Sequence, residues 1–122
     1  MLLCKYIFIY KIMKELEKVK YGILFSYYGK LLNKNQQEIL NLYLFEDLGF
    51  SEIANNYNTS RQAIRQVIIN SKLRLDKYEE DLKIVERIRN FSHELENIIK
   101  NENLDYNIKE KLKEIILNIE EF

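Results

Sequence analysis

The stretch from residue 50 to residue 75 constrains the fold of this chain more than any other. It reads FSEIANNYNTSRQAIRQVIINSKLRL. Ile53 and the small Ala54 are spaced to face a core, and Ile64 and Val67 resume that apolar spacing beyond a polar break. Asn58 lies in the break, and Asn tolerates a left-handed backbone better than most residues that carry a side chain. The pattern predicts a helix, a tight turn and a second helix, which is a helix-turn-helix. An ordinary helical hairpin inside a bundle is the alternative.

Capping residues indicate where these two helices begin. Ser51 is an expected N-cap for a first helix over residues 52–57. Thr59 or Ser60 is an expected N-cap for the second helix, and Thr59 with Gln62 has the spacing of a capping box. The sequence therefore marks both helix starts on either side of the predicted turn.

Two helices are expected before this stretch. The first spans residues 14–32, with an apolar stripe formed by Leu16, Val19, Ile23, Leu24, Tyr27 and Leu31. Asn33 and Gln36 then have the spacing of a capping box, which predicts a helix to about residue 47 or 48. Its expected buried face is formed by Ile39, Leu40, Tyr43 and Leu44. The aromatic cluster of Phe25, Tyr27 and Tyr28 is expected to form core or subunit contacts rather than a base-stacking platform.

Beyond Ser60 no helix stop is evident until about residue 101. A heptad seam is formed by Ile64, Ile68, Ser71, Leu75, Tyr78, Leu82 and Val85. We therefore expect the second helix of the motif to continue as a long arm. Residues 101–105 break it, and Asp105 or Asn107 is expected to cap a last helix that folds back antiparallel on the arm. The apolar stripe of this last helix is Ile108, Leu112, Ile115, Ile116, Ile119 and Phe122.

The near absence of helix breakers supports an all-α fold. The 122 residues contain no Pro and only three Gly, so long helices with few interruptions are expected. We expect a helix-turn-helix domain over residues 13–75 and a helical arm with a return helix over residues 76–122. Residues 1–12 are a doubtful N-terminal extension, because the character of the sequence changes at Met13, our hypothetical start of the native chain.

Residues 1–12 do not resemble a targeting segment. They are apolar but short, Lys5 and Lys11 interrupt them, and no small-residue cleavage site follows. We expect neither a signal peptide nor a membrane span. Cys4 is the only cysteine, so no disulfide within the chain and no cysteine metal cluster can form. A cytoplasmic protein is the natural interpretation.

Charge is distributed unevenly along the chain. The net charge is zero and the pI is about 6.6, which argues against strong non-specific nucleic-acid binding. From Ile53 to Leu75, however, there is no Asp or Glu, and the segment holds Arg61, Arg65 and Arg74. A solvated helix face is the simpler explanation, yet the basic patch coincides with the second helix of the motif.

The outer face of that helix is the candidate binding site. Arg61 and Arg65 could reach guanine edges or phosphates, and Gln62 and Gln66 could reach adenine. Ile69 also points outward, and an exposed apolar residue suits a protein partner better than a phosphate backbone. The candidate residues are Ser60, Arg61, Gln62, Arg65, Gln66, Ile69 and Lys72. DNA, RNA and protein all remain open as the ligand.

The sequence carries no pattern of catalytic chemistry. Its one histidine, His93, falls on the predicted arm. Phosphate-binding Gly-rich loops, metal-ligand spacings and nucleophile motifs are missing from the sequence. We expect a non-enzymatic protein without cofactor or metal. A homodimer is expected, because the heptad seam and the aromatic first helix offer more apolar surface than one small domain buries.

Two known families resemble this chain. The segments YYGKLL, LYLFEDL, SEIA and TSRQAI resemble the YlxM-type proteins, small bacterial helix-turn-helix proteins usually linked to the signal recognition particle pathway through gene neighbourhood. The module is also similar to the fourth region of sigma factors, of the winged-helix-like superfamily, whose matching residues here are Ser60, Arg61, Ile64, Arg65 and Gln66. Ala63 departs from the sigma pattern, which usually has a charged residue there.

The first resemblance implies a regulatory or accessory protein of the signal recognition particle pathway, whose partner is the particle's protein or RNA. The sigma-like module implies a DNA-binding transcription regulator as the alternative. A helical protein–protein interaction scaffold that no longer reads nucleic acid is the third possibility. Gln66 and Ile69 stand where YlxM-type relatives are expected to carry an acidic and a basic residue.

Overall fold

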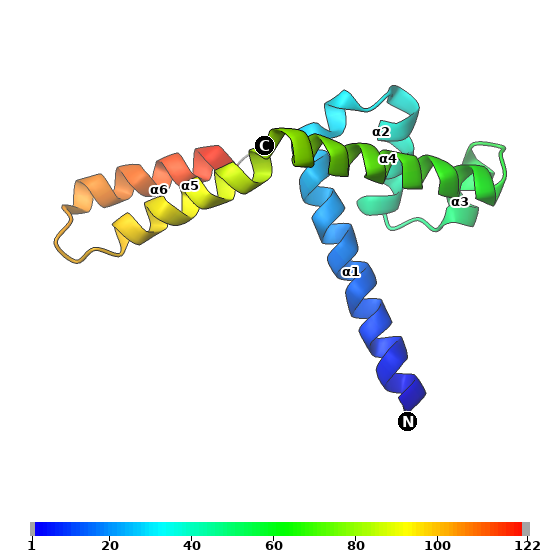
Figure 1. Ribbon diagram of the computed structural model, residues 1–122, viewed down its shortest axis with the longest axis horizontal. Coiled ribbons are helices and arrows are strands. Elements are labelled where there is room, and N and C mark those ends of the chain that lie inside the picture. The colour runs from blue at the N-terminus through cyan, green and yellow to red at the C-terminus, as the bar shows by residue number, and fades with distance from the viewer. Residues whose placement is uncertain (1, 121–122) are drawn as a thin grey trace. The chain divides into compact units, whose positions relative to one another are not determined.

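The structure is a computed structural model that describes residues 2–120, and this range is built of helices without strands. In chain order the elements are α1 (Leu2–Tyr28), the 3-10 turn η1 (Gly29–Leu31), α2 (Lys34–Leu44), α3 (Phe50–Asn56), α4 (Arg61–Leu82), α5 (Ile84–Ile99) and α6 (Tyr106–Glu120) (Figure 1). The chain divides into two compact units, Met1–Asp81 and Leu82–Phe122. The predicted all-α fold is confirmed.

The first unit is organised around α4. Ile64, Ile68 and Leu75 on one side of α4 are almost completely buried, at 1%, 1% and 0% exposure. The preceding helices also bury Tyr28, Ile39, Leu40 and Ile53, each at 2% exposure or less. Four of the seven residues of the predicted heptad seam therefore lie inside this core. The polar one, Ser71, is buried with its hydroxyl donating to the Val67 carbonyl at 2.7 Å.

The helix-turn-helix forms as α3, a turn and α4. Asn58 adopts the predicted left-handed conformation with φ 51°, and the Thr59 N–H donates to the Ala54 carbonyl at 3.0 Å. Ile53 and Ala54 are buried as predicted. The predicted cap at Ser51 is wrong, because α3 begins at Phe50 after the extended Gly49. Gly49 is the extended residue that precedes the first turn of α3, so Ser51 lies inside the helix.

The predicted capping box upstream of the motif is confirmed. Asn33 Oδ1 accepts from the Gln36 N–H at 2.8 Å, and Gln36 Oε1 accepts from the Asn33 N–H at 3.2 Å. The helix that follows, α2, ends at Leu44, earlier than predicted. Asp47, with φ 53°, cannot continue a right-handed helix. Asp47 instead forms an ion pair with Lys18 of α1 at 2.5 Å.

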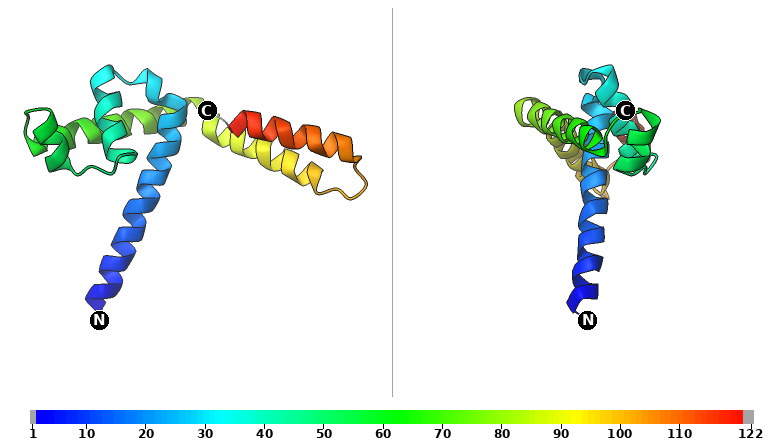
Figure 2. Two further views of the ribbon diagram at one scale, coloured as in Figure 1. Left: turned by 180° about the vertical axis from the view of Figure 1, so that it is seen from behind. Right: turned by 90° about the vertical axis from the view of Figure 1, so that its right-hand side faces the viewer.

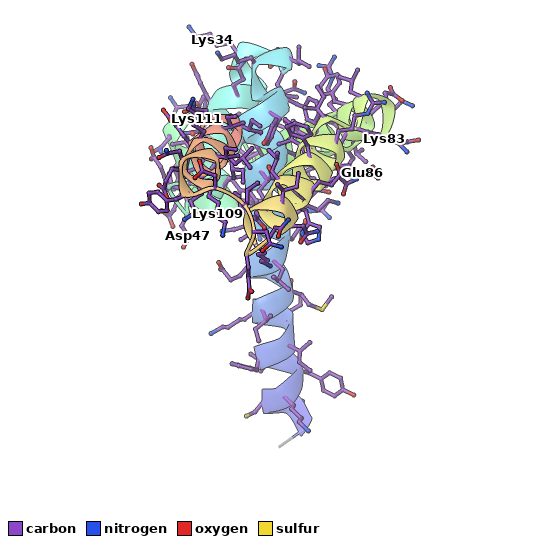
Figure 3. The ribbon with its side chains drawn as sticks, turned by 90° about the vertical axis from the view of Figure 1, so that its left-hand side faces the viewer. Lys34, Asp47, Lys83, Glu86, Lys109 and Lys111 are labelled. Carbon is purple, nitrogen blue, oxygen red and sulfur yellow. The ribbon has the colours of Figure 1, made fainter. Side chains whose placement is uncertain are left out.

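Helix α1 begins earlier than predicted, and of the predicted stripe it buries Leu24, at 5% exposure. Leu16, Val19 and Leu31 are exposed at 62%, 59% and 54%, whereas Tyr21 and Tyr28 are buried. The tyrosines reach the core because their hydroxyls find carboxylate acceptors on α4. Phe25, Tyr27 and Tyr28 belong to the part of α1 that packs on the core, as expected. The first turns of α1 carry exposed apolar side chains that stand clear of the helix (Figure 3).

The predicted continuous arm is interrupted. Helix α4 ends at Leu82, Lys83 is left-handed with φ 55°, and α5 begins at Ile84. Neither Gly nor Pro marks this break, so the apolar spacing did not predict it.

The predicted return helix is confirmed, because α5 and α6 run antiparallel, side by side (Figures 1 and 2). Asp105 directly precedes α6, and its carbonyl accepts from the Lys109 N–H at 3.0 Å. Phe122 lies outside the described residues.

Candidate nucleic-acid interface

The N-terminal end of α4 presents the predicted polar side chains to solvent. Ser60, Arg61, Gln62, Arg65 and Gln66 are all exposed. Their orientation follows from the burial of Ile64 and Ile68 on the opposite side of the helix, which fixes its rotation. The structure therefore brings five of the seven predicted site residues together on one exposed end of the helix.

Ser60 is the N-cap of α4. Its Oγ accepts a hydrogen bond from the Ala63 N–H at 3.1 Å. Of the two candidate N-caps, Ser60 is therefore the one that caps α4. The capping box predicted for Thr59 and Gln62 does not begin this helix. This leaves the Gln62 side chain exposed at the first turn of the helix.

An aromatic contact orients Arg61. Its guanidinium lies over the Phe50 ring at 5.8 Å from the ring centre, and Phe50 in turn lies 5.4 Å from the ring of Tyr43. A cation held over a ring keeps its N–H donors at the rim, available to another acceptor. Phe50 thus connects the core of the unit to the first residue of α4. Phe50 is not among the site residues predicted from the sequence.

A second polar pair lies one turn farther along α4. The Gln66 side-chain amide donates to Asn70 Oδ1 at 3.0 Å, and both side chains are exposed. Such a pair holds one amide in place while its remaining donors and acceptors face solvent. Asn70 is not among the predicted site residues, although two amide side chains four residues apart on a helix are spaced to form a hydrogen bond.

Lys72 and Ile69 are placed differently from the other predicted residues. Lys72 forms an ion pair with Glu17 of α1 at 2.7 Å, and its side chain is only 16% exposed. Its ammonium lies 5.1 Å from the ring centres of both Tyr21 and Tyr43. Ile69 is half-buried. Lys72 therefore faces the interior junction of three helices rather than the exposed end of α4.

The turn beside the site is tied down from α2. The Tyr57 hydroxyl donates to Glu38 at 3.3 Å, and burial together with the Glu38 charge raises the pKa of Tyr57 above its usual value. Tyr57 ends α3, so this bond holds the helix end next to the left-handed Asn58. The turn that sets the two motif helices is thereby anchored to α2.

The described residues show neither a metal site nor a membrane-spanning helix. Over residues 2–120 no group of three or more His, Cys, Asp or Glu side chains is placed to hold a metal ion. Within the same range, every helix is too short or too polar to cross a membrane. His93 is exposed.

Comparison with known proteins identifies the family. Residues 14–115 match the model of the UPF0122 family, described as "Putative helix-turn-helix protein, YlxM / p13 like". The chain belongs to this family. The match includes the helix-turn-helix and most of the α5–α6 hairpin.

Relatives with substantial identity agree with the assignment. A UPF0122 protein of Clostridium perfringens is 41% identical over 103 residues, covering 78% of this chain and 92% of the relative. One of Malacoplasma penetrans is 42% identical over 92 residues, covering 75% of this chain and 85% of the relative. Another, of Desulforamulus reducens, is 39% identical over 87 residues, covering 71% and 73%. The predicted resemblance to YlxM-type proteins is confirmed.

Proposed function

We propose that this protein is a non-enzymatic, cytoplasmic accessory protein of the signal recognition particle pathway, and that the N-terminal end of α4 binds the RNA of the particle. Family membership supports the pathway, because the YlxM-type proteins that this chain resembles are linked to it. The exposed basic and amide side chains of α4 support a nucleic-acid ligand rather than a small molecule.

One observation carries the choice of α4. Arg61, Gln62, Arg65 and Gln66 are exposed together, while no acidic residue occurs from Ile53 to Leu75. A phosphate backbone is repelled by carboxylates and attracted by guanidinium groups, so an acid-free end with two arginines is suited to it. The neutral net charge of the chain favours a local contact of this kind over extended non-specific binding.

DNA is the second candidate ligand. Gln62 and Gln66 are exposed on the second helix of a helix-turn-helix, the position from which such helices reach base edges in the major groove. The similarity to the fourth region of sigma factors favours this candidate, and it would make the protein a transcription regulator. The experiment must therefore separate RNA from DNA.

Binding measured as a function of salt tests the proposal. The full chain is titrated against the RNA of the particle and against duplex DNA of equal length, by fluorescence anisotropy at several salt concentrations. We expect binding to the RNA with a slope of log Kd against log salt that falls by roughly two when Arg61→Ala and Arg65→Ala are combined. The matched control is Lys30→Ala with Lys34→Ala, which removes two exposed positive charges elsewhere in the same unit.

The outcomes are distinct. Tighter binding to duplex DNA than to the RNA would favour the transcription regulator. Equal losses in the arginine and lysine double variants would show that overall charge, and not α4, is responsible. Binding only to the particle's protein, unaffected by the arginine variants, would favour the interaction scaffold and overturn the proposal.

A further inference from the structure

The hairpin of α5 and α6 leaves much of its apolar surface uncovered. The two helices contain 16 and 15 residues. Val85, Ser92 and Ile116 are buried, at 7%, 5% and 8% exposure. Several other apolar side chains of the two helices remain exposed, among them Phe91 at 51%, Ile98 at 47%, Ile108 at 48% and Ile115 at 45%. Apolar side chains left half exposed on a helical hairpin gain stabilisation when another surface covers them, so this face is suited to a partner.

Four of these exposed side chains are arranged in two columns, one on each helix. Phe91 and Ile98 are seven residues apart on α5, and Ile108 and Ile115 are seven residues apart on α6. Residues at this spacing lie on the same side of a helix, as in a heptad. Phe91 and Ile115 line one groove along the hairpin, which also includes Ile88 and Ile119. One member of each column, Phe91 on α5 and Ile115 on α6, therefore borders this groove.

The spacing specifies the kind of cover. With Phe91 and Ile98 at d positions, Ile88 and Leu95 occupy a positions, so α5 carries a complete a and d seam. Helix α6 repeats the pattern with Leu112 between Ile108 and Ile115. An apolar heptad seam packs against other helices of the same period, and two such hairpins facing each other form a four-helix bundle.

The charged residues beside the seam allow two copies of α5 to pair with each other. Arg87 and Glu94 occupy the g positions of α5, both are exposed, and they lie on either side of the helix midpoint near Phe91. When two copies of α5 pack antiparallel about that midpoint, Arg87 of each copy faces Glu94 of the other. The two-fold operation thus produces two opposite-charge pairs and no like-charge pair at these positions.

Four of the seven residues of the predicted heptad seam are buried in the core of the first unit. Ile64, Ile68 and Leu75 are at 1% exposure or less in the core of the first unit. These residues are therefore unavailable to a second copy, and the hairpin offers exposed apolar side chains in their place.

We propose that the groove between α5 and α6 is covered by the same groove of a second copy of this chain, with the two α5 helices antiparallel across a two-fold axis near Phe91. The dimer is a four-helix bundle. The apolar columns supply the contact area, and the reciprocal pairs of Arg87 and Glu94 set the direction and register of the helices.

Cross-linking tests the position of the axis. In full-length chain carrying Cys4→Ser, Phe91→Cys places a thiol beside the axis, whereas His93→Cys places one on the opposite side of α5. Mild oxidation is expected to give a covalent dimer of Phe91→Cys and not of His93→Cys, on a non-reducing gel. Equal cross-linking of the two variants, or none with Phe91→Cys, would overturn the proposal.

A charge exchange tests the register. Arg87→Glu places like charges together twice and is expected to weaken the dimer roughly tenfold, measured by analytical ultracentrifugation. Arg87→Glu with Glu94→Arg is expected to restore it. Circular dichroism checks that each variant remains helical. The proposal is contradicted if the helical chain is monomeric at tens of micromolar, or if the double variant dimerises no more tightly than Arg87→Glu. A different protein would then be the partner that covers the groove.

Discussion

Lys72 on α4 and Glu17 on α1 form an ion pair, with Nζ and Oε1 2.7 Å apart, although they are 55 residues apart in sequence. The Lys72 ammonium also lies 5.1 Å from the ring centres of Tyr21 on α1 and Tyr43 on α2. One cation thus connects α4 to two other helices of the first unit, α1 and α2. We infer that Lys72 stabilises the junction that supports the motif, whereas Arg61 and Arg65 remain available to a ligand.

The Lys72 junction leads to a prediction about stability. Lys72→Ala removes a shielded ion pair, two cation–π contacts and the packing of the aliphatic stem, so the free energy of unfolding should fall by about 1–2 kcal/mol. Urea unfolding followed by tyrosine fluorescence measures it, because eight of the nine tyrosines precede residue 82. Lys77→Ala is the control, since Lys77 pairs with Asp81 on the surface and should matter far less. Equal effects would contradict the assignment.

The cap of α4 gives a second prediction. Ser60→Ala removes the acceptor of the Ala63 N–H and should lower the free energy of unfolding by about 1 kcal/mol. Thr59→Ala, one residue earlier, is the matched control and should change it by less than about half of that. Thermal unfolding of both variants decides between the two caps. A larger loss for Thr59→Ala would mean that α4 starts one residue earlier than described.

The motif could be predicted from the sequence because its signals are local. Asn58 at the turn, Ile53 and Ala54 facing the core, and the capping box of Asn33 with Gln36 each depend on neighbours within a few residues. Backbone sterics and capping act over that range, so a single sequence carries them. The five exposed residues at the start of α4 followed from the same local periodicity.

The errors concern tertiary contacts. Leu16 and Val19 fit an amphipathic stripe, but α1 buries Tyr21 and Tyr28, whose hydroxyls donate to Asp76 at 2.8 Å and Glu79 at 2.6 Å. The spacing of apolar residues does not show that a carboxylate on a distant helix will accept a hydrogen bond from the Tyr21 hydroxyl. The burial of Lys72 was missed for the same reason, because its three contacts come from other helices.

The pair of Tyr21 and Asp76 predicts a dependence of stability on high pH. Burial raises the pKa of Tyr21 well above its usual value, and the hydrogen bond to the Asp76 carboxylate and its charge raise it further. The folded chain thus holds a proton that the unfolded chain releases, so stability is full below about pH 10 and declines as the pH rises beyond it. Tyr21→Phe should flatten the decline between about pH 10 and 12, measured by urea midpoints at each pH. Tyr106→Phe, an exposed tyrosine, is the control. An unchanged slope in Tyr21→Phe would contradict the shift.

The left-handed turn residue gives the last prediction. Asn58 has φ 51°, a conformation that costs roughly 1 kcal/mol for a residue with a Cβ, less for Asn and nothing for Gly. Asn58→Ala should therefore destabilise the first unit by about 1 kcal/mol, while Asn58→Gly should preserve or slightly raise its stability. Asn56→Ala is the matched control, because Asn56 is exposed at the end of α3 in right-handed conformation and should tolerate Ala. Urea unfolding measures all three. If Ala and Gly behave alike at position 58, the turn does not require a positive φ. The geometry that sets α4 against α3 would then have another cause.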